Sequence, residues 1–176
     1  METRVEIPDD APIMLIRFTK LTNDRHRFEV IRDTGARESR ELETRSFLLH
    51  DLVHYAVETE ANLNSVFYGQ LHAGRTIDEI TQMPSPDPEA MQAERIVAQI
   101  QGASKMDDWA SADPAAFATT VASSLRAIGD EPPLWLTPDF ITRVRDNLRR
   151  VQGQWRATPF HQTMELRFPV PPERAR

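Results

Sequence analysis

The side chains best suited to chemistry in this chain lie together in residues 47–61, FLLHDLVHYAVETEA. This stretch contains an HDxxH motif that begins at His50-Asp51 and ends at His54, and Glu58 follows after a further helical turn. On an α-helix these four side chains occupy an arc of about 100°, because residues four apart share a face. Two imidazoles on adjacent turns can bind a divalent metal, most readily zinc. Asp51 or Glu58 would then orient or deprotonate a metal-bound water.

Two short resemblances accompany the motif. It is similar to the HExxH helix of zinc metalloproteases, in which the second position is the general base, and here that position holds Asp51, one methylene shorter than glutamate. It also resembles the HDxxH metal motif of a family of ubiquinone-biosynthesis proteins. That family has a glutamate twelve residues after the second histidine, where this chain has Val66.

A longer resemblance covers SFLLHDLVHYAVE at 46–58 and FYGQLHAG at 67–74. These segments are similar to a group of small bacterial proteins without an assigned activity. The resemblance implies a β-meander followed by a helix pair, and it implies no substrate.

A second interpretation of the polar arc is that it is the solvent-facing side of an amphipathic helix in a non-catalytic interaction or structural domain. Short motifs such as HDxxH often occur by chance. One detail weighs against this second interpretation, because the chain has 21 lysines and arginines and none of them lies on this arc. An ordinary exposed helix face mixes both signs of charge.

A zinc site needs at least one ligand beyond the two histidines. The candidates are Glu58 on the same helix and, further along the chain, His72, Asp78 and Glu79. His72 is expected near the end of one helix and the two acids in the first turn of the next, so each could instead serve to stabilise a helix dipole. The predicted metal ligands are therefore His50, His54, Glu58 and His72.

The elements that must position this helix are predicted from hydrophobic periodicity. Residues 13–19 are apolar on both faces, as in a central strand, and residues 27–32 alternate apolar and charged side chains. A third strand ending at Leu42 has charged residues suited to an exposed edge. Residues 163–170 alternate again and are expected to return to this meander. The pattern predicts an α+β fold, with an antiparallel meander at 12–44, a returning C-terminal strand, and five to six helices on one side.

Helix ends are marked by capping residues. Ser46 is the expected N-cap of the HDxxH helix, and Thr76 that of a short helix at 76–83, which follows another short helix at 63–73. After a proline-rich linker at 84–88, three helices between 88 and 153 share one pattern. They open with Asp87-Pro88, Asp113-Pro114 and Thr137-Pro138, and they are expected to stop at Gly102, Gly129 and Gly153.

Composition and charge restrict the classes of protein to which this chain could belong. A length of 176 residues, with 40% apolar and 27% charged side chains, predicts a single globular domain. The net charge of −6 argues against nucleic-acid binding. The absence of cysteine fits a cytoplasmic protein. METRVEIPDD has no signal-peptide core, and no apolar run is long enough to span a membrane. These patterns predict neither a substrate, nor a partner, nor an oligomeric state.

Overall fold

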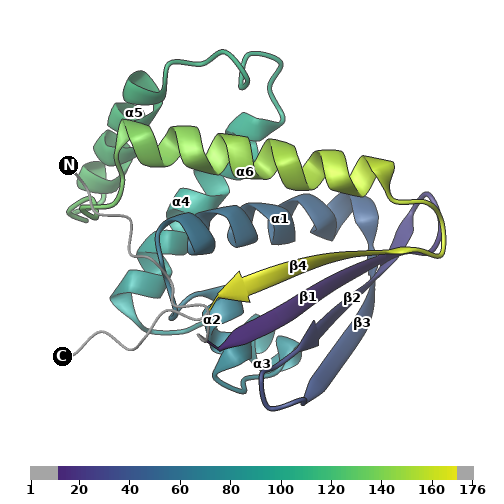
Figure 1. The fold of residues 1–176 in the computed structure, drawn as a ribbon. Coiled ribbons are helices and arrows are strands. Elements are labelled where there is room, and N and C mark those ends of the chain that lie inside the picture. Colours follow the sequence, from purple (N-terminus) through teal and green to yellow (C-terminus); the bar gives the residue numbers. More distant parts are fainter. Residues whose placement is uncertain (1–11, 170–176) are drawn as a thin grey trace.

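The fold is built on a four-stranded antiparallel sheet, seen in a computed structural model that describes residues 12–169 (Figure 1). The strands follow the order β3-β2-β1-β4. Their bounds are Ile13–Lys20 for β1, Arg25–Ile31 for β2, Arg37–Glu43 for β3 and Thr163–Pro169 for β4. The predicted α+β class, with a meander and a returning strand, is confirmed. Val170, expected at the end of β4, lies outside the described residues, as does the N-terminal segment METRVEIPDD.

β1 is a central strand, as its sequence predicts. Ile16 lies opposite Val30 of β2 on one side and Leu166 of β4 on the other. Met14, Ile16 and Phe18 are fully buried on the face that meets the helices. The charged strand β3 forms one edge of the sheet, and β4, which ends at Pro169, forms the other.

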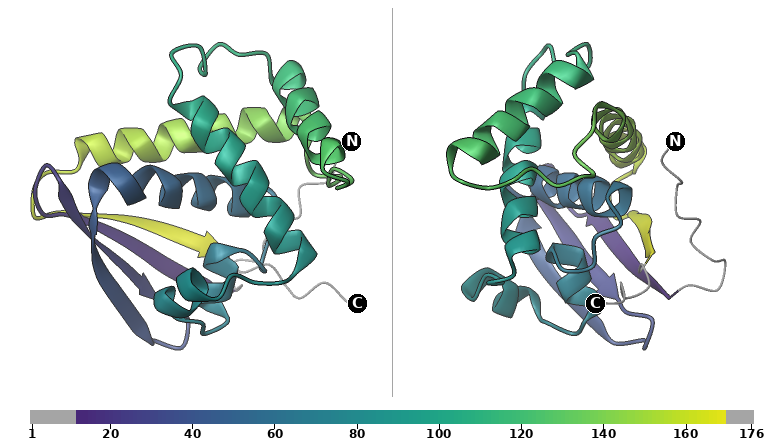
Figure 2. Two further views of the ribbon diagram at one scale, coloured as in Figure 1. Left: turned by 180° about the vertical axis from the view of Figure 1, so that it is seen from behind. Right: turned by 90° about the vertical axis from the view of Figure 1, so that its left-hand side faces the viewer.

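Within residues 12–169, six helices pack on one side of the sheet (Figures 1 and 2). α1 (Thr44–Glu60) lies against the sheet, and α6 (Pro138–Ala157) runs beside it. α4 (Pro88–Ser104) crosses α1, and α5 (Pro114–Ala127) packs on α6. The short helices α2 (Phe67–His72) and α3 (Ile77–Gln82) lie at one end of the sheet. No helix in the described part of the chain has both the length and the apolar character needed to cross a bilayer.

The predicted N-caps of four helices are confirmed. Thr76 and Glu79 form a reciprocal capping box at the start of α3. Asp87, Asp113 and Thr137 each accept a hydrogen bond from a backbone N–H in the first turn of α4, α5 and α6. In these three helices a proline follows the cap, at a position where its missing N–H is not needed.

Two predicted helix starts are wrong. α1 begins at Thr44, directly after β3, and Ser46 lies inside it and donates a hydrogen bond to Glu43 instead of capping the helix. α2 begins at Phe67, four residues later than expected, and residues 63–66, which follow a left-handed Asn62, form a bend without helical structure.

Two predicted helix ends are also wrong. α4 passes through Gly102 and α6 passes through Gly153. A glycine favours termination when it adopts positive φ, and of the three expected stops only Gly129 does so, at 87°. The last fully buried residues of these helices, Ile100 of α4 and Val151 of α6, come before the glycines, so both helices continue past their buried stripes.

Candidate metal centre

The polar arc of α1 is mostly buried. Asp51, His54 and Glu58 are 3%, 0% and 1% exposed, and His50 retains an exposure of 38% in its side chain. The interpretation of this arc as a solvent-facing surface therefore does not hold. α2 and α4 pack on α1 and cover it. Buried charged and polar groups need partners, so the contacts of each of these side chains are informative.

Glu58 contacts the Nδ1 side of the His54 ring and fixes its orientation. Its Oε1 lies 3.0 Å from Nδ1 of His54, across one turn of α1. Its Oε2 accepts hydrogen bonds from the backbone N–H groups of Tyr68 and Gly69, at 3.0 Å and 3.2 Å. The first N–H groups of a helix have no partner within that helix, and Glu58 supplies one to α2. The carboxylate is fixed by these donors, so it fixes the ring of His54 and leaves Nε2 facing away from it.

Asp51 contacts the corresponding nitrogen of His50, but its carboxylate is less firmly held than that of Glu58, because its buried Oδ2 accepts no hydrogen bond from the described residues. The Oδ1 atom of Asp51 lies 3.0 Å from Nδ1 of His50. The hydroxyl of Tyr68 donates to the backbone carbonyl of Asp51 at 2.9 Å, which ties α2 to this turn of α1. A carboxylate on one imidazole nitrogen is the usual support of a metal-binding histidine, because it sets the orientation and the tautomer of the ring.

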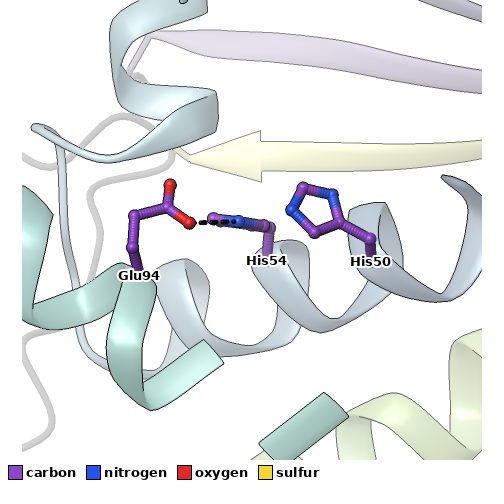
Figure 3. A group of neighbouring side chains, drawn as sticks. All are labelled: His50, His54 and Glu94. Carbon is purple, nitrogen blue, oxygen red and sulfur yellow. Dashed lines mark ion pairs between the residues drawn. The ribbon is translucent and has the colours of Figure 1, made fainter. Parts of the chain in front are cut away.

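Glu94 of α4 completes a group of three candidate ligands. Its Oε2 lies 3.2 Å from Nε2 of His54, but the direction of the contact is not that of a hydrogen bond. One ligand atom each from His50, His54 and Glu94 lies within 4.8 Å of the others. Figure 3 shows the ring of His50 turned toward the His54–Glu94 pair. Ligand atoms of a tetrahedral zinc site are about 3.4 Å apart, so the His54–Glu94 spacing already fits such a site.

The charges around His54 favour a cation. Burial opposes protonation of His54, but the contacts with Glu58 and Glu94 outweigh burial and raise its pKa to about 9. Burial raises the pKa of Glu58 by more than its contacts with His54, Tyr68 and Gly69 lower it. For Glu94 burial acts in the same direction, but the contact with His54 outweighs it and lowers the pKa. A positive charge at this point is thus stabilised by two carboxylates, whether a proton or a metal ion carries it.

The other predicted site residues lie apart from this group. Nε2 of His72 is 3.2 Å from Oδ1 of Asp33, and Asp78 pairs with Arg40 at 2.8 Å. Glu79 belongs to the capping box of α3. Asp51 and Glu58, predicted as bases, contact the Nδ1 sides of the two imidazoles.

The sequence prediction missed Glu94, and α4 carries no clear signal for it. Ala90 and Val97, one turn before and after Glu94, are buried, but the side chain of Glu94 is 49% exposed. A half-exposed acidic residue is ordinary on a helix surface. Its contact, His54, lies on a different helix and cannot be identified from spacing within α4.

A cavity of about 810 Å³ adjoins two of the three residues, His50 and Glu94, whereas His54 is fully buried and does not line it. His50, Asp51 and Glu94 form part of its wall, together with Phe67 of α2 and Ile77 of α3. The candidate metal position therefore has one side that is not occupied by protein ligands.

Comparison of the chain with protein-family models, with curated proteins and with solved structures finds no match.

Proposed function

We propose that the chain binds a divalent transition-metal ion, with zinc the first candidate, through His50, His54 and Glu94. The observation that carries the proposal is that each imidazole has a buried carboxylate on Nδ1, which leaves Nε2 as the atom available to a metal. Two histidines and one glutamate are the protein ligands of several catalytic zinc sites.

The proposal gives Asp51 and Glu58 a positioning role instead of the role of a base. Both carboxylates already contact the Nδ1 atoms of the two ligands. A zinc ion lowers the pKa of water to about 7, so hydrolysis at this centre does not require an additional carboxylate base. Catalytic zinc sites keep one coordination position open, and the adjoining cavity supports a metal-dependent hydrolase over a purely structural zinc site.

Metal analysis of protein purified without an affinity tag tests this proposal. After incubation with zinc and dialysis, we expect about one equivalent of zinc in the wild type and less than about a tenth in His54→Ala. His72→Ala is the matched control and should retain the wild-type content, because His72 pairs with Asp33 away from the centre. Less than about a tenth of an equivalent of any transition metal in the wild type would overturn the proposal. A finding of stoichiometric iron would support the site and identify iron as its metal, since two histidines and a carboxylate also bind Fe(II).

A second candidate function, a non-catalytic interaction or structural domain, is favoured by one observation. A protonated His54 can link three helices without a metal. Its imidazole lies on α1 between Glu58, which binds the backbone of α2, and Glu94 of α4. Thermal unfolding with and without a chelator separates the two candidates. Metal binding to the folded state raises Tm, so a chelator should lower the Tm of the zinc-loaded protein. An unchanged Tm favours the structural domain.

A further inference from the structure

The polar side chains that line the cavity are mostly engaged with other protein groups. Arg40 pairs with Asp78, and Arg95 with Asp130. Hydrogen bonds within the protein also engage Gln70, Thr81, Ser46 and Ser85. A ligand in the cavity therefore meets few polar groups that need a partner, apart from those at the metal centre. Because both arginines are paired, the lining also offers little attraction to a phosphate or another anionic group.

Apart from Gln101, the remaining lining is apolar. Phe67, Ile77, Ile80 and Leu42 face the interior of the cavity. Phe47 and Met91 also line it and are exposed at 45% and 44%, so the apolar surface extends to solvent. An apolar ligand would remove this surface from water, which is the main source of affinity in such pockets. The volume of about 810 Å³ lies within the range typical of small-molecule sites.

We infer that the cavity binds the uncharged apolar body of a small substrate, such as the acyl chain of a medium-chain ester or amide. Its single polar head places a carbonyl oxygen at the metal held by His50, His54 and Glu94. This inference rests on the proposed metal binding and adds the substrate class. It follows from the position of His50 and Glu94 in the wall of a cavity in which most of the other polar side chains are already engaged.

A series of hydroxamic acids tests the inference, because a hydroxamate binds zinc through two oxygens and its alkyl chain can be varied. Zinc binding is measured first, by titration calorimetry, and its absence overturns the proposed function and the inference together. Acetohydroxamic, butyrohydroxamic, hexanohydroxamic and octanohydroxamic acids are then titrated into the zinc-loaded protein. Affinity should rise by up to about fourfold for each methylene that becomes buried. Equal affinity across the series, in protein that holds zinc, overturns the inference and leaves the metal site intact.

A cavity-filling variant locates the binding. Ile80→Trp places a larger side chain in the cavity and leaves the three ligands unchanged. We expect it to bind zinc and acetohydroxamic acid as the wild type does, and to lose at least about tenfold of its affinity for octanohydroxamic acid. Ile128→Trp is the control, because Ile128 is exposed at the end of α5 and does not line the cavity. Wild-type affinity of a folded, zinc-loaded Ile80→Trp protein for octanohydroxamic acid would overturn the inference.

Discussion

His54 and Glu58 form a contact of 3.0 Å that is fully removed from water. Both residues lie on α1, one helical turn apart, but the contact also anchors α2, because Glu58 accepts hydrogen bonds from the backbone of Tyr68 and Gly69. The pair thus connects the orientation of a candidate metal ligand to the packing of a neighbouring helix. It can be tested whether or not a metal is bound.

Removal of the Glu58 carboxylate should destabilise the fold strongly. Glu58→Ala leaves two backbone N–H groups and the imidazole of His54 without their acceptor, so we expect the free energy of unfolding to fall by about 3–5 kcal/mol. Urea denaturation measures the change. Glu165→Gln is a control on the opposite face of the sheet, where the pair with Arg17 is exposed and its loss should cost less than about 1 kcal/mol. An equal effect of the two substitutions would contradict the role given to Glu58.

The stability of the metal-free protein should depend on pH above neutrality. The folded-state pKa of His54, about 9, lies above its unfolded value near 6.5. Its stabilising contribution is therefore complete below about pH 6.5 and is lost as pH rises toward about 9. Glu58 acts in the same direction, because its folded-state pKa is also raised. Zinc affinity should increase over the same interval, since zinc replaces the proton on His54.

NMR titration of the imidazole of His54 checks this dependence directly. We expect its resonances to shift near pH 9 in the metal-free protein, and chemical denaturation to show a falling free energy of unfolding between pH 6.5 and 9. A resonance of His54 that titrates at or below its unfolded pKa would contradict the prediction.

Glu94 should be required for tight metal binding. Glu94→Gln removes the only charged ligand of the three, so we expect zinc affinity to fall by at least about 100-fold. Competition with a chromogenic chelator measures the affinity. Glu79→Gln, in the capping box of α3, should keep the wild-type affinity. Equal affinities of the two variants would remove Glu94 from the site.

Two glycine substitutions should have opposite effects on stability. A Cβ on Gly69 would lie 2.2 Å from the backbone of Asn64, so Gly69→Ala must displace the start of α2 and should cost about 3 kcal/mol or more. Gly102 lies inside α4 with open space around it, and Gly102→Ala should stabilise the protein by about 0.5–1 kcal/mol. Thermal unfolding of both variants checks the pair. A stable Gly69→Ala protein would mean that α2 does not pack as closely on the preceding turn as the contacts indicate.

The parts of the fold set by local sequence were predicted well. Alternation in β2 and β4 identified strands and their buried faces, and Asp87-Pro88, Asp113-Pro114 and Thr137-Pro138 identified helix starts. The start of α1 was missed because β3 continues directly into the helix, where Glu43 occupies the N-cap position without a side-chain cap.

For the candidate site, the sequence predicted the residues on α1 but not the contacts that α1 makes with other helices. Helical phase places His50, His54 and Glu58 on one side of α1, and the structure agrees. Periodicity does not reveal whether another helix covers that side, nor that Glu94 reaches it from α4. The roles of the carboxylates also depend on such contacts, because the position of Glu58 behind His54 follows from the backbone donors of α2.

The attachment of Glu58 to main-chain amides has a kinetic consequence. No side-chain replacement in α2 deletes those donors, short of proline, so a bound ion would be retained for as long as α2 stays docked on α1. We expect the rate of zinc extraction to level off at high chelator concentration, at the rate of local opening of residues 61–75. Stopped-flow measurements would reveal this plateau, and a rate that rises linearly without limit would show that the ion leaves while α2 stays in place.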